Sequence, residues 1–155
     1  MTAAGYEHYE ISSFCQTGQS CHHNLAYWNG NNYFALGPGA ASYLDGVRRV
    51  NHRGTMAYLS LLEQGKSPVV TTETLTHEQH AIDLLVFGLR QTSGVSFTKI
   101  QQRTGFDLLK AGAQVIEEQQ QHELLILDGE HGRLSQKGIL LYDSVVNQWV
   151  KLAAD

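Results

Sequence analysis

The sequence predicts an α+β protein in which a carboxy-terminal winged-helix-like helical domain follows a region of short strands. Two observations support this fold class. Before about residue 70, glycine and asparagine are dense and the apolar residues come in short runs, whereas longer helical patterns fill the rest of the chain. In that second part, a helix-turn-helix pattern is followed by a hairpin signal and a last helix, which is the element order of a winged helix.

The second region begins with the clearest helix signal of the chain. Thr76 and Gln79 form a capping box, and the apolar stripe that follows predicts a helix running to about Gln91. A short helix over residues 98–103 is expected to end at Gly105. These are the first two helices of the predicted domain.

The remaining elements of this domain follow from two caps and a turn. Asp107 predicts the start of a longer helix that continues through Ile116. The stretch LLILDGEHGRLS alternates around Asp128-Gly129 and predicts a hairpin. Ser135 then caps the predicted last helix.

The first region predicts only isolated elements. HYEIS at residues 8–12 is typical of a short strand, and residues 33–44 are typical of a strand that breaks into a glycine turn. Residues 51–64 predict a helix closed by Gly65. Strands this short need neighbours to satisfy their edges, so these pieces do not make a closed fold by themselves.

The distribution of charge makes nucleic acid a poor partner. The net charge of −4 sits in the carboxy-terminal half, because up to residue 70 acidic and basic residues balance at four each. The candidate recognition helix beginning at Asp107 sets Lys110 against Glu117 and Glu118, so it offers no cationic face to phosphates. We therefore expect the winged helix to be a packing or interaction module.

Targeting signals and cysteine usage favour a cytoplasmic protein. No run of eighteen apolar residues occurs, which predicts no transmembrane segment, and the amino terminus lacks a signal-peptide pattern. Cys15 and Cys21 lie too close together for a stapling disulfide framework and suit reduced thiols.

The stretch CHHNLAYWNG, residues 21–30, concentrates candidate ligands in a segment where we find no helical or strand period. Haem iron accepts an imidazole nitrogen, and a porphyrin face needs flat apolar surface, which Tyr27 and Trp28 could supply. Spacing alone does not distinguish His22 from His23. Both could equally be loop histidines beside buried aromatic residues, and zinc held with the two cysteines lacks any standard finger spacing.

The longer stretch YEISSFCQTGQSCHHNLAYWNGNNYFALGPGAASYL resembles the latter part of the radical-SAM barrel in the family of oxygen-independent coproporphyrinogen III oxidases. Within it, HNLAYW at residues 23–28 matches the HNxxYW motif of the haem chaperone branch, HemW. RLSQKGILLYDSVV resembles the end of the family's carboxy-terminal helical domain.

This resemblance implies a domain organisation. Residues 1–48 would be the carboxy-terminal part of a radical SAM (β/α) barrel, residues 49–70 a connecting helix and linker, and residues 71–155 the HemN C-terminal-type winged-helix domain. Complete family members carry a C-x-x-x-C-x-x-C motif that holds a 4Fe-4S cluster and leaves one iron for S-adenosylmethionine. That motif is absent here, so we expect a truncated chain that lacks the amino-terminal barrel half and is inactive alone.

The resemblance also assigns site residues. It selects His23 as the haem ligand and metal-binding residue, with Asn24, Tyr27 and Trp28 as its neighbours in the motif. It also places the segment with Gly37, Gly39 and Ala40 near the S-adenosylmethionine and substrate side of the barrel. Simple turn chemistry explains these three small residues equally well.

Three functions remain open at this point. HNxxYW favours a fragment of a haem chaperone that passes haem to an unidentified recipient protein. The first alternative is a fragment of a coproporphyrinogen III oxidase of porphyrin biosynthesis. The second is a stand-alone winged-helix interaction module.

Overall fold

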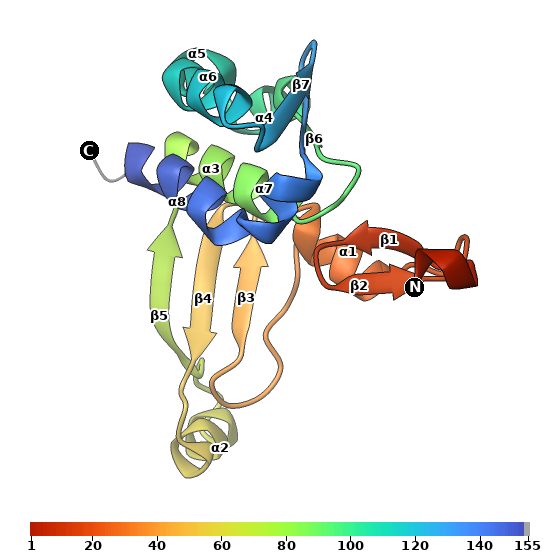
Figure 1. Ribbon diagram of the computed structural model, residues 1–155. Helices are drawn as coiled ribbons and strands as arrows, with labels where there is room; N and C mark the ends of the chain where they lie inside the picture. The colour runs from red at the N-terminus through yellow and green to blue at the C-terminus, as the bar shows by residue number, and fades with distance from the viewer. Residues whose placement is uncertain (154–155) are drawn as a thin grey trace. The chain divides into compact units, whose positions relative to one another are not determined.

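The computed structural model describes residues 1–153, a mixed α/β chain that divides into two compact units (Figure 1). The first unit consists of residues 1–30 and the chain from residue 77 onward, and the second consists of residues 31–76. Every strand pair assigned within residues 1–153 is antiparallel. No helix in this range is long and apolar enough to span a bilayer.

The carboxy-terminal part of the first unit combines helices with a three-stranded sheet of order β6-β8-β7. Its elements in chain order are α3 (His77–Gly88), β6 (Val95–Ser96), α4 (Phe97–Thr104), α5 (Leu108–Ala111), α6 (Ala113–Gln121), β7 (Leu125–Asp128), β8 (His131–Leu134), α7 (Gln136–Leu140) and α8 (Tyr142–Leu152). The hairpin predicted around the Asp-Gly turn is confirmed as β7 and β8.

Local caps set where these helices begin and end. The Asp107 carboxylate accepts a hydrogen bond from the Lys110 amide, and the Ser135 hydroxyl accepts one from the Gly138 amide. Both predicted helix starts are therefore confirmed. Gly105 ends α4 with φ 74°, in the left-handed region that favours glycine, which confirms the predicted helix end.

Two of the predicted helices are each divided in two. The helix expected from Asp107 through Ile116 breaks at Gly112, where a Cβ atom would collide with the Trp149 ring and approach the Leu108 carbonyl. The last helix breaks at Leu141, whose φ of −110° and ψ of 24° lie outside the α-helical region. The continuous helices were wrong because these breaks depend on packing and backbone geometry that an apolar stripe does not record.

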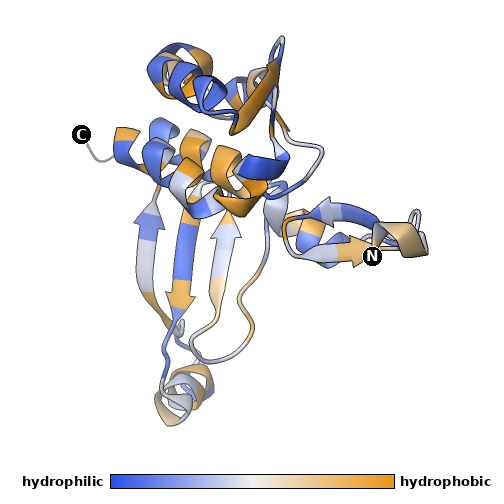
Figure 2. Cartoon of the chain, viewed as in Figure 1, coloured by the Kyte–Doolittle hydropathy of each residue, from blue (hydrophilic) through white to orange (hydrophobic). Residues whose placement is uncertain are grey.

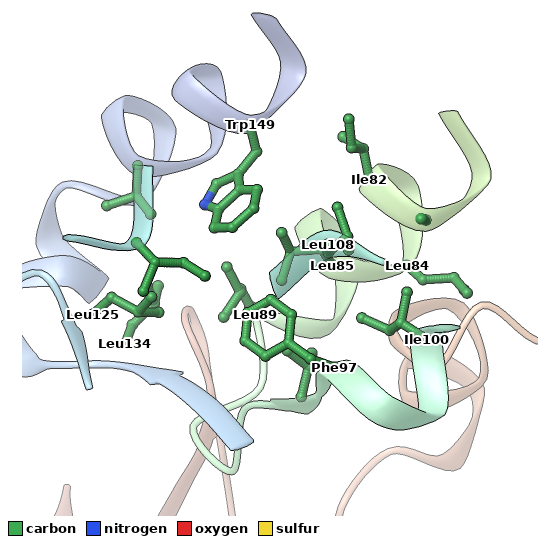
Figure 3. Packing of buried hydrophobic residues seen from close by; sticks show 14 residues of the cluster. Ile82, Leu84, Leu85, Leu89, Phe97, Ile100, Leu108, Leu125, Leu134 and Trp149 are labelled. Carbon is green, nitrogen blue, oxygen red and sulfur yellow. The ribbon is translucent and has the colours of Figure 1, made fainter. Parts of the chain in front are cut away.

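The hydrophobic core of the first unit lies among these helices and the sheet (Figure 3). Trp149 and Phe97 are almost fully buried, with ring centroids 6.2 Å apart. The indole N–H of Trp149 donates to the Gln119 amide oxygen, and the amide nitrogen of Gln119 donates to the Val145 carbonyl. The core thus buries its large aromatic residues while satisfying their polar atoms.

The amino-terminal segment of the first unit contains a 3-10 turn (η1, Thr2–Ala4), a hairpin of β1 (Glu7–Glu10) and β2 (Ser13–Cys15), and helix α1 (His22–Trp28). The backbone amide of Ile11 donates to the Arg90 carbonyl, and the amide of Thr92 donates to the Tyr9 carbonyl. These bonds attach β1 to the segment after α3. The strand expected in HYEIS at residues 8–12 is thus present, but it begins one residue earlier and ends two residues earlier than predicted.

Helix α1 corrects the expectation that residues 21–30 are irregular. The segment contains only two turns, which is too short to display a 3.6-residue apolar period. Leu25 and Ala26 favour helix, and α1 packs against α3. Contacts with residues far along the chain therefore stabilise this helix, which its own short sequence does not predict.

The second unit contains a three-stranded sheet, β3 (Ala41–Leu44), β4 (Val47–Asn51) and β5 (Val69–Thr74) in that order, and helix α2 (Thr55–Glu63). Its predicted helix is present but begins four residues late, because Asn51 belongs to β4 and donates its side-chain amide to the Gly37 carbonyl. The strand predicted to begin at residue 33 instead begins at Ala41. Tyr33 forms only an isolated bridge, and its partner is Tyr43 of β3.

The expected domain division at residues 48 and 70 stays a prediction, and the compact units fall elsewhere. Residues 49–70 contain the end of β4 and the start of β5, so they contribute to the sheet of the second unit. Residues 1–30 group with the carboxy-terminal region because the β1 hairpin bonds to the segment after α3 and α1 packs against α3. A composition shift along the sequence does not record such long-range pairing.

Candidate functional site

Helix α1 places His23 and Tyr27 one turn apart. Their rings meet edge to face with centroids 4.9 Å apart. Both His22 and His23 are exposed, and Tyr27 is half-buried. His23 therefore presents an imidazole to solvent beside an aromatic ring, while His22 lies on a different side of the helix.

Trp28, the last residue of α1, turns toward α3 and the residues after it. The guanidinium carbon of Arg90 lies 4.4 Å from the Trp28 ring centroid, and the Phe87 ring stacks at 6.3 Å. The buried indole nitrogen of Trp28 finds no hydrogen-bond acceptor within residues 1–153. The aromatic pair of the motif is thus divided between two environments.

The carboxyl end of α1 is held by α4 and by the residue that follows Arg90. Arg103 donates from its two terminal nitrogens to the carbonyls of Asn29 and Gly30, each at 2.7 Å. The Gln91 side-chain amide donates to the Asn29 side chain at 3.0 Å. A cation at this helix end also matches the partial negative charge of its free carbonyls.

A cavity of about 240 Å³ lies beside this helix end. Its lining includes Trp28, Leu84 and Ile100 as apolar surface, and Lys99 and Arg103 as cationic groups. Arg103 already donates to two carbonyls at the end of α1. We therefore interpret the cavity as a gap in the packing of α1 against α3 and α4.

Glu10 is 1% exposed although it carries a carboxylate. The Ser12 amide and hydroxyl donate to one oxygen at 2.8 and 2.7 Å, and Arg90 pairs with the other oxygen at 3.2 Å. Burial by itself raises the pKa of Glu10, but hydrogen bonds from Ser12 and Ser13 and the charge of Arg90 outweigh it. The pKa of Glu10 is therefore lowered from 4.5, and the carboxylate stays ionised.

The glycine turn in the second unit uses its amide donors within the unit. The amide of Gly37 donates to the Tyr58 hydroxyl, and the amide of Gly39 donates to the His52 carbonyl. The amide of Ala40 donates to the Gly37 carbonyl. Gly37 and Gly39 both have positive φ, at 98° and 69°. Turn chemistry accounts for these residues, and their assignment to a cofactor remains a prediction.

The cysteines do not form a metal centre. Cys15 is buried, Cys21 is exposed, and both are free thiols. Among residues 1–153, no group of three or more His, Cys, Asp or Glu side chains is placed to hold a metal ion. A 4Fe-4S cluster of the radical SAM type needs three thiolates, so the residues of this chain do not fit it.

Sequence reasoning missed the residues that hold the motif. Arg90 and Arg103 contact α1 from more than 60 positions along the chain, and Glu10 meets Arg90 across 80 positions. The sequence offered one signal for this contact: Arg90 is a charged residue that directly follows the apolar stripe of the predicted helix.

Comparison with known proteins identifies the domain around α3. The family model described as "HemN C-terminal domain" matches residues 75–141. This part of the chain belongs to the HemN C-terminal domain family. The match covers α3 through α7, including the sheet and most of the core, and ends just before α8.

Curated relatives extend the similarity to the amino-terminal segment. The heme chaperone HemW of Bacillus subtilis is 36% identical over 108 residues, covering 70% of this chain and 28% of its own length. HemW of Mycobacterium tuberculosis (strain H37Rv) is 33% identical over 153 residues, covering 94% and 35%. The chain spans about a third of the length of these relatives.

A solved structure shows the same fold. Coproporphyrinogen III oxidase (HemN) from Escherichia coli, a radical SAM enzyme, matches with a TM-score of 0.72 over 96% of this chain and 38% of that one. At 14% sequence identity, this likeness concerns the fold alone.

Proposed function

We propose that this chain is part of a haem chaperone and that it binds haem through His23. The observation that carries the proposal is the exposed imidazole of His23, set edge to face against Tyr27 on a helix fixed at its opposite end. The similarity to heme chaperones named HemW supports the same reading.

The chemistry of the donor fits haem as cargo. A neutral imidazole nitrogen binds haem iron axially, and the ring of Tyr27 supplies flat surface beside it. Asn24, the next residue of the motif, adds a polar group on the same short helix. Trp28 contacts Arg90 and Phe87, so its contribution to haem binding is to hold the helix.

The finer fold assignments belong to the same proposal. The order α3, β6, α4, α5 with α6, β7 and β8 supports a winged-helix domain used for packing. In a longer protein, residues 1–48 would join a radical SAM barrel with a 4Fe-4S cluster and S-adenosylmethionine near Gly37, Gly39 and Ala40. The free thiols of Cys15 and Cys21 agree with a cytoplasmic location.

An oxidase fragment is the second candidate, because the family model that matches residues 75–141 is named after HemN, a name that a coproporphyrinogen III oxidase also carries. The chaperone is preferred since the relatives that are about a third identical to this chain are named heme chaperones. The exposed imidazole of His23, which can bind haem iron, is the chemical reason for this preference.

The test compares two adjacent histidines. Ferric haem is titrated into the chain, and the Soret band is recorded for wild type, His23→Ala and His22→Ala. We expect His23→Ala to abolish or strongly shift the band and His22→Ala to retain most of it, because neighbouring side chains on a helix point about 100° apart.

His122→Ala is the matched control, since it removes an exposed imidazole from the end of α6. Its Soret band should equal that of wild type. Equal losses from His22→Ala and His23→Ala would indicate adventitious coordination, and no loss from His23→Ala would overturn the proposal.

A further inference from the structure

Arg90 joins three segments that lie far apart in the sequence. Its guanidinium pairs with Glu10 of β1 at 3.2 Å, lies 4.4 Å from the Trp28 ring centroid and 5.4 Å from that of Tyr142 at the start of α8. The Arg90 carbonyl accepts from the Ile11 amide. One side chain therefore meets β1, α1 and α8.

The Glu10 partner fixes where this guanidinium can lie. The carboxylate is nearly fully buried, and the bonds from Ser12 hold its first oxygen. Its second oxygen points to Arg90. Because a buried carboxylate without a partner is unfavourable, the pair constrains Arg90 to one position.

The aromatic partners make use of the planar shape of the guanidinium. Arginine stacks on aromatic faces, whereas a lysine ammonium is a point charge with strong hydration. Tyr142 is itself fixed, since its hydroxyl donates to the Val86 carbonyl at 2.7 Å. Arg90 thus presents a fixed cationic surface to the Trp28 ring.

Helix α1 depends on such external contacts. It has seven residues, none of them buried, and no side-chain hydrogen bond caps its start. Helices this short are not stable by themselves in water. The direction of His23 is therefore set by the far end of α1, where Trp28 meets Arg90 and where Arg103 bonds Asn29 and Gly30.

We propose that Arg90 is a positioning residue for His23: it anchors Trp28, and through Trp28 it fixes the helix that presents the haem ligand. The inference rests on the proposed function for its haem consequence alone. It divides the motif HNLAYW into a ligand part, His23 with Tyr27, and an anchor, Trp28.

Amide hydrogen exchange of the chain tests the anchor without haem. Two variants remove it in different ways. Arg90→Lys keeps a positive charge for Glu10 but loses the planar stack, and Trp28→Leu leaves the ion pair intact. We expect amides 26–30 to exchange about tenfold faster in both variants, as a local opening does, while amides of β7 and β8 keep their wild-type rates.

The double variant should exchange no faster than the faster single variant, because both changes break one contact. Arg133→Lys is the control, an exposed arginine on β8, and should leave α1 unchanged. Unchanged exchange at 26–30 in both variants would overturn the inference. Equal acceleration in α1, β7 and β8 would also overturn it, since the effect would then be general.

A haem titration provides the readout that simple destabilisation would not move. In the Arg90→Lys background, a loosened α1 lets either imidazole reach the iron, so His22→Ala and His23→Ala should reduce the Soret band by similar amounts. A preserved preference for His23 would overturn positioning by Arg90. If wild type binds no haem, the proposed function fails, and the exchange experiment still decides whether Arg90 anchors the helix.

Discussion

The two compact units differ in how they are held together. The first unit contains the buried hydrophobic cluster around Trp149 and Phe97. In the second unit, α2 carries hydrophobic residues (Figure 2), yet none of residues 55–63 is buried, and Met56 is 79% exposed. Burial of apolar area dominates stability, so the first unit should depend on its core and the second on backbone pairing and polar contacts such as Asn51.

The largest effect should come from truncating the core. Trp149→Ala removes a fully buried indole and leaves the Gln119 oxygen without its donor, so we expect a loss of about 3–5 kcal/mol in the free energy of unfolding. Met56→Ala should change it by about 0.5 kcal/mol or less, because its side chain already meets solvent. Urea unfolding followed by circular dichroism measures both. Similar losses from the two variants would break the comparison between the units.

Within the first unit, features held by local contacts differ from those held by distant contacts in how far the sequence predicts them. Caps at Asp107 and Ser135 and the helix end at Gly105 depend on residues within one turn, and the structure places them as predicted. Helix α1 depends on Arg90 and Arg103, which are more than 60 positions away, so the residues of α1 alone do not predict a helix. The HNxxYW motif predicts the candidate ligand His23. The tertiary contacts that hold its helix appear only in the structure.

A smaller effect on stability should come from the Glu10–Arg90 pair and, unlike the effect of the hydrophobic core, should depend on pH. The pKa of Glu10 is lower in the folded protein than its ordinary 4.5, although burial alone would raise it. The stabilising contribution of Glu10 is therefore complete above about pH 4.5 and is lost as the pH falls through the folded-state pKa. Thermal unfolding between pH 7 and pH 3 should show this loss in wild type.

Glu10→Gln should be less stable than wild type at pH 7 and should lose less stability on acidification. Glu7→Gln on the same strand is the control, since Glu7 is exposed and meets Thr17 instead. A pH profile of Glu10→Gln parallel to that of wild type would show that the Glu10–Arg90 pair does not couple to folding.

The smallest expected effect concerns nucleic acid, where charge distinguishes the two units. Residues 31–76 carry four basic and three acidic residues, while the rest of the chain carries seven basic and twelve acidic ones. Helix α6, the candidate recognition helix if the domain is a winged helix, contains Glu117 and Glu118 and no lysine or arginine.

Duplex DNA binds chiefly through phosphate contacts with basic side chains, and at low salt these contacts are least screened. Titration of a labelled random duplex at low salt should therefore show no saturable binding in the micromolar range. Salt-sensitive micromolar binding that survives replacement of Arg48 and Arg49 would place a DNA surface on the first unit and contradict its role as a packing module, whereas binding lost with those arginines would assign it to β4 of the second.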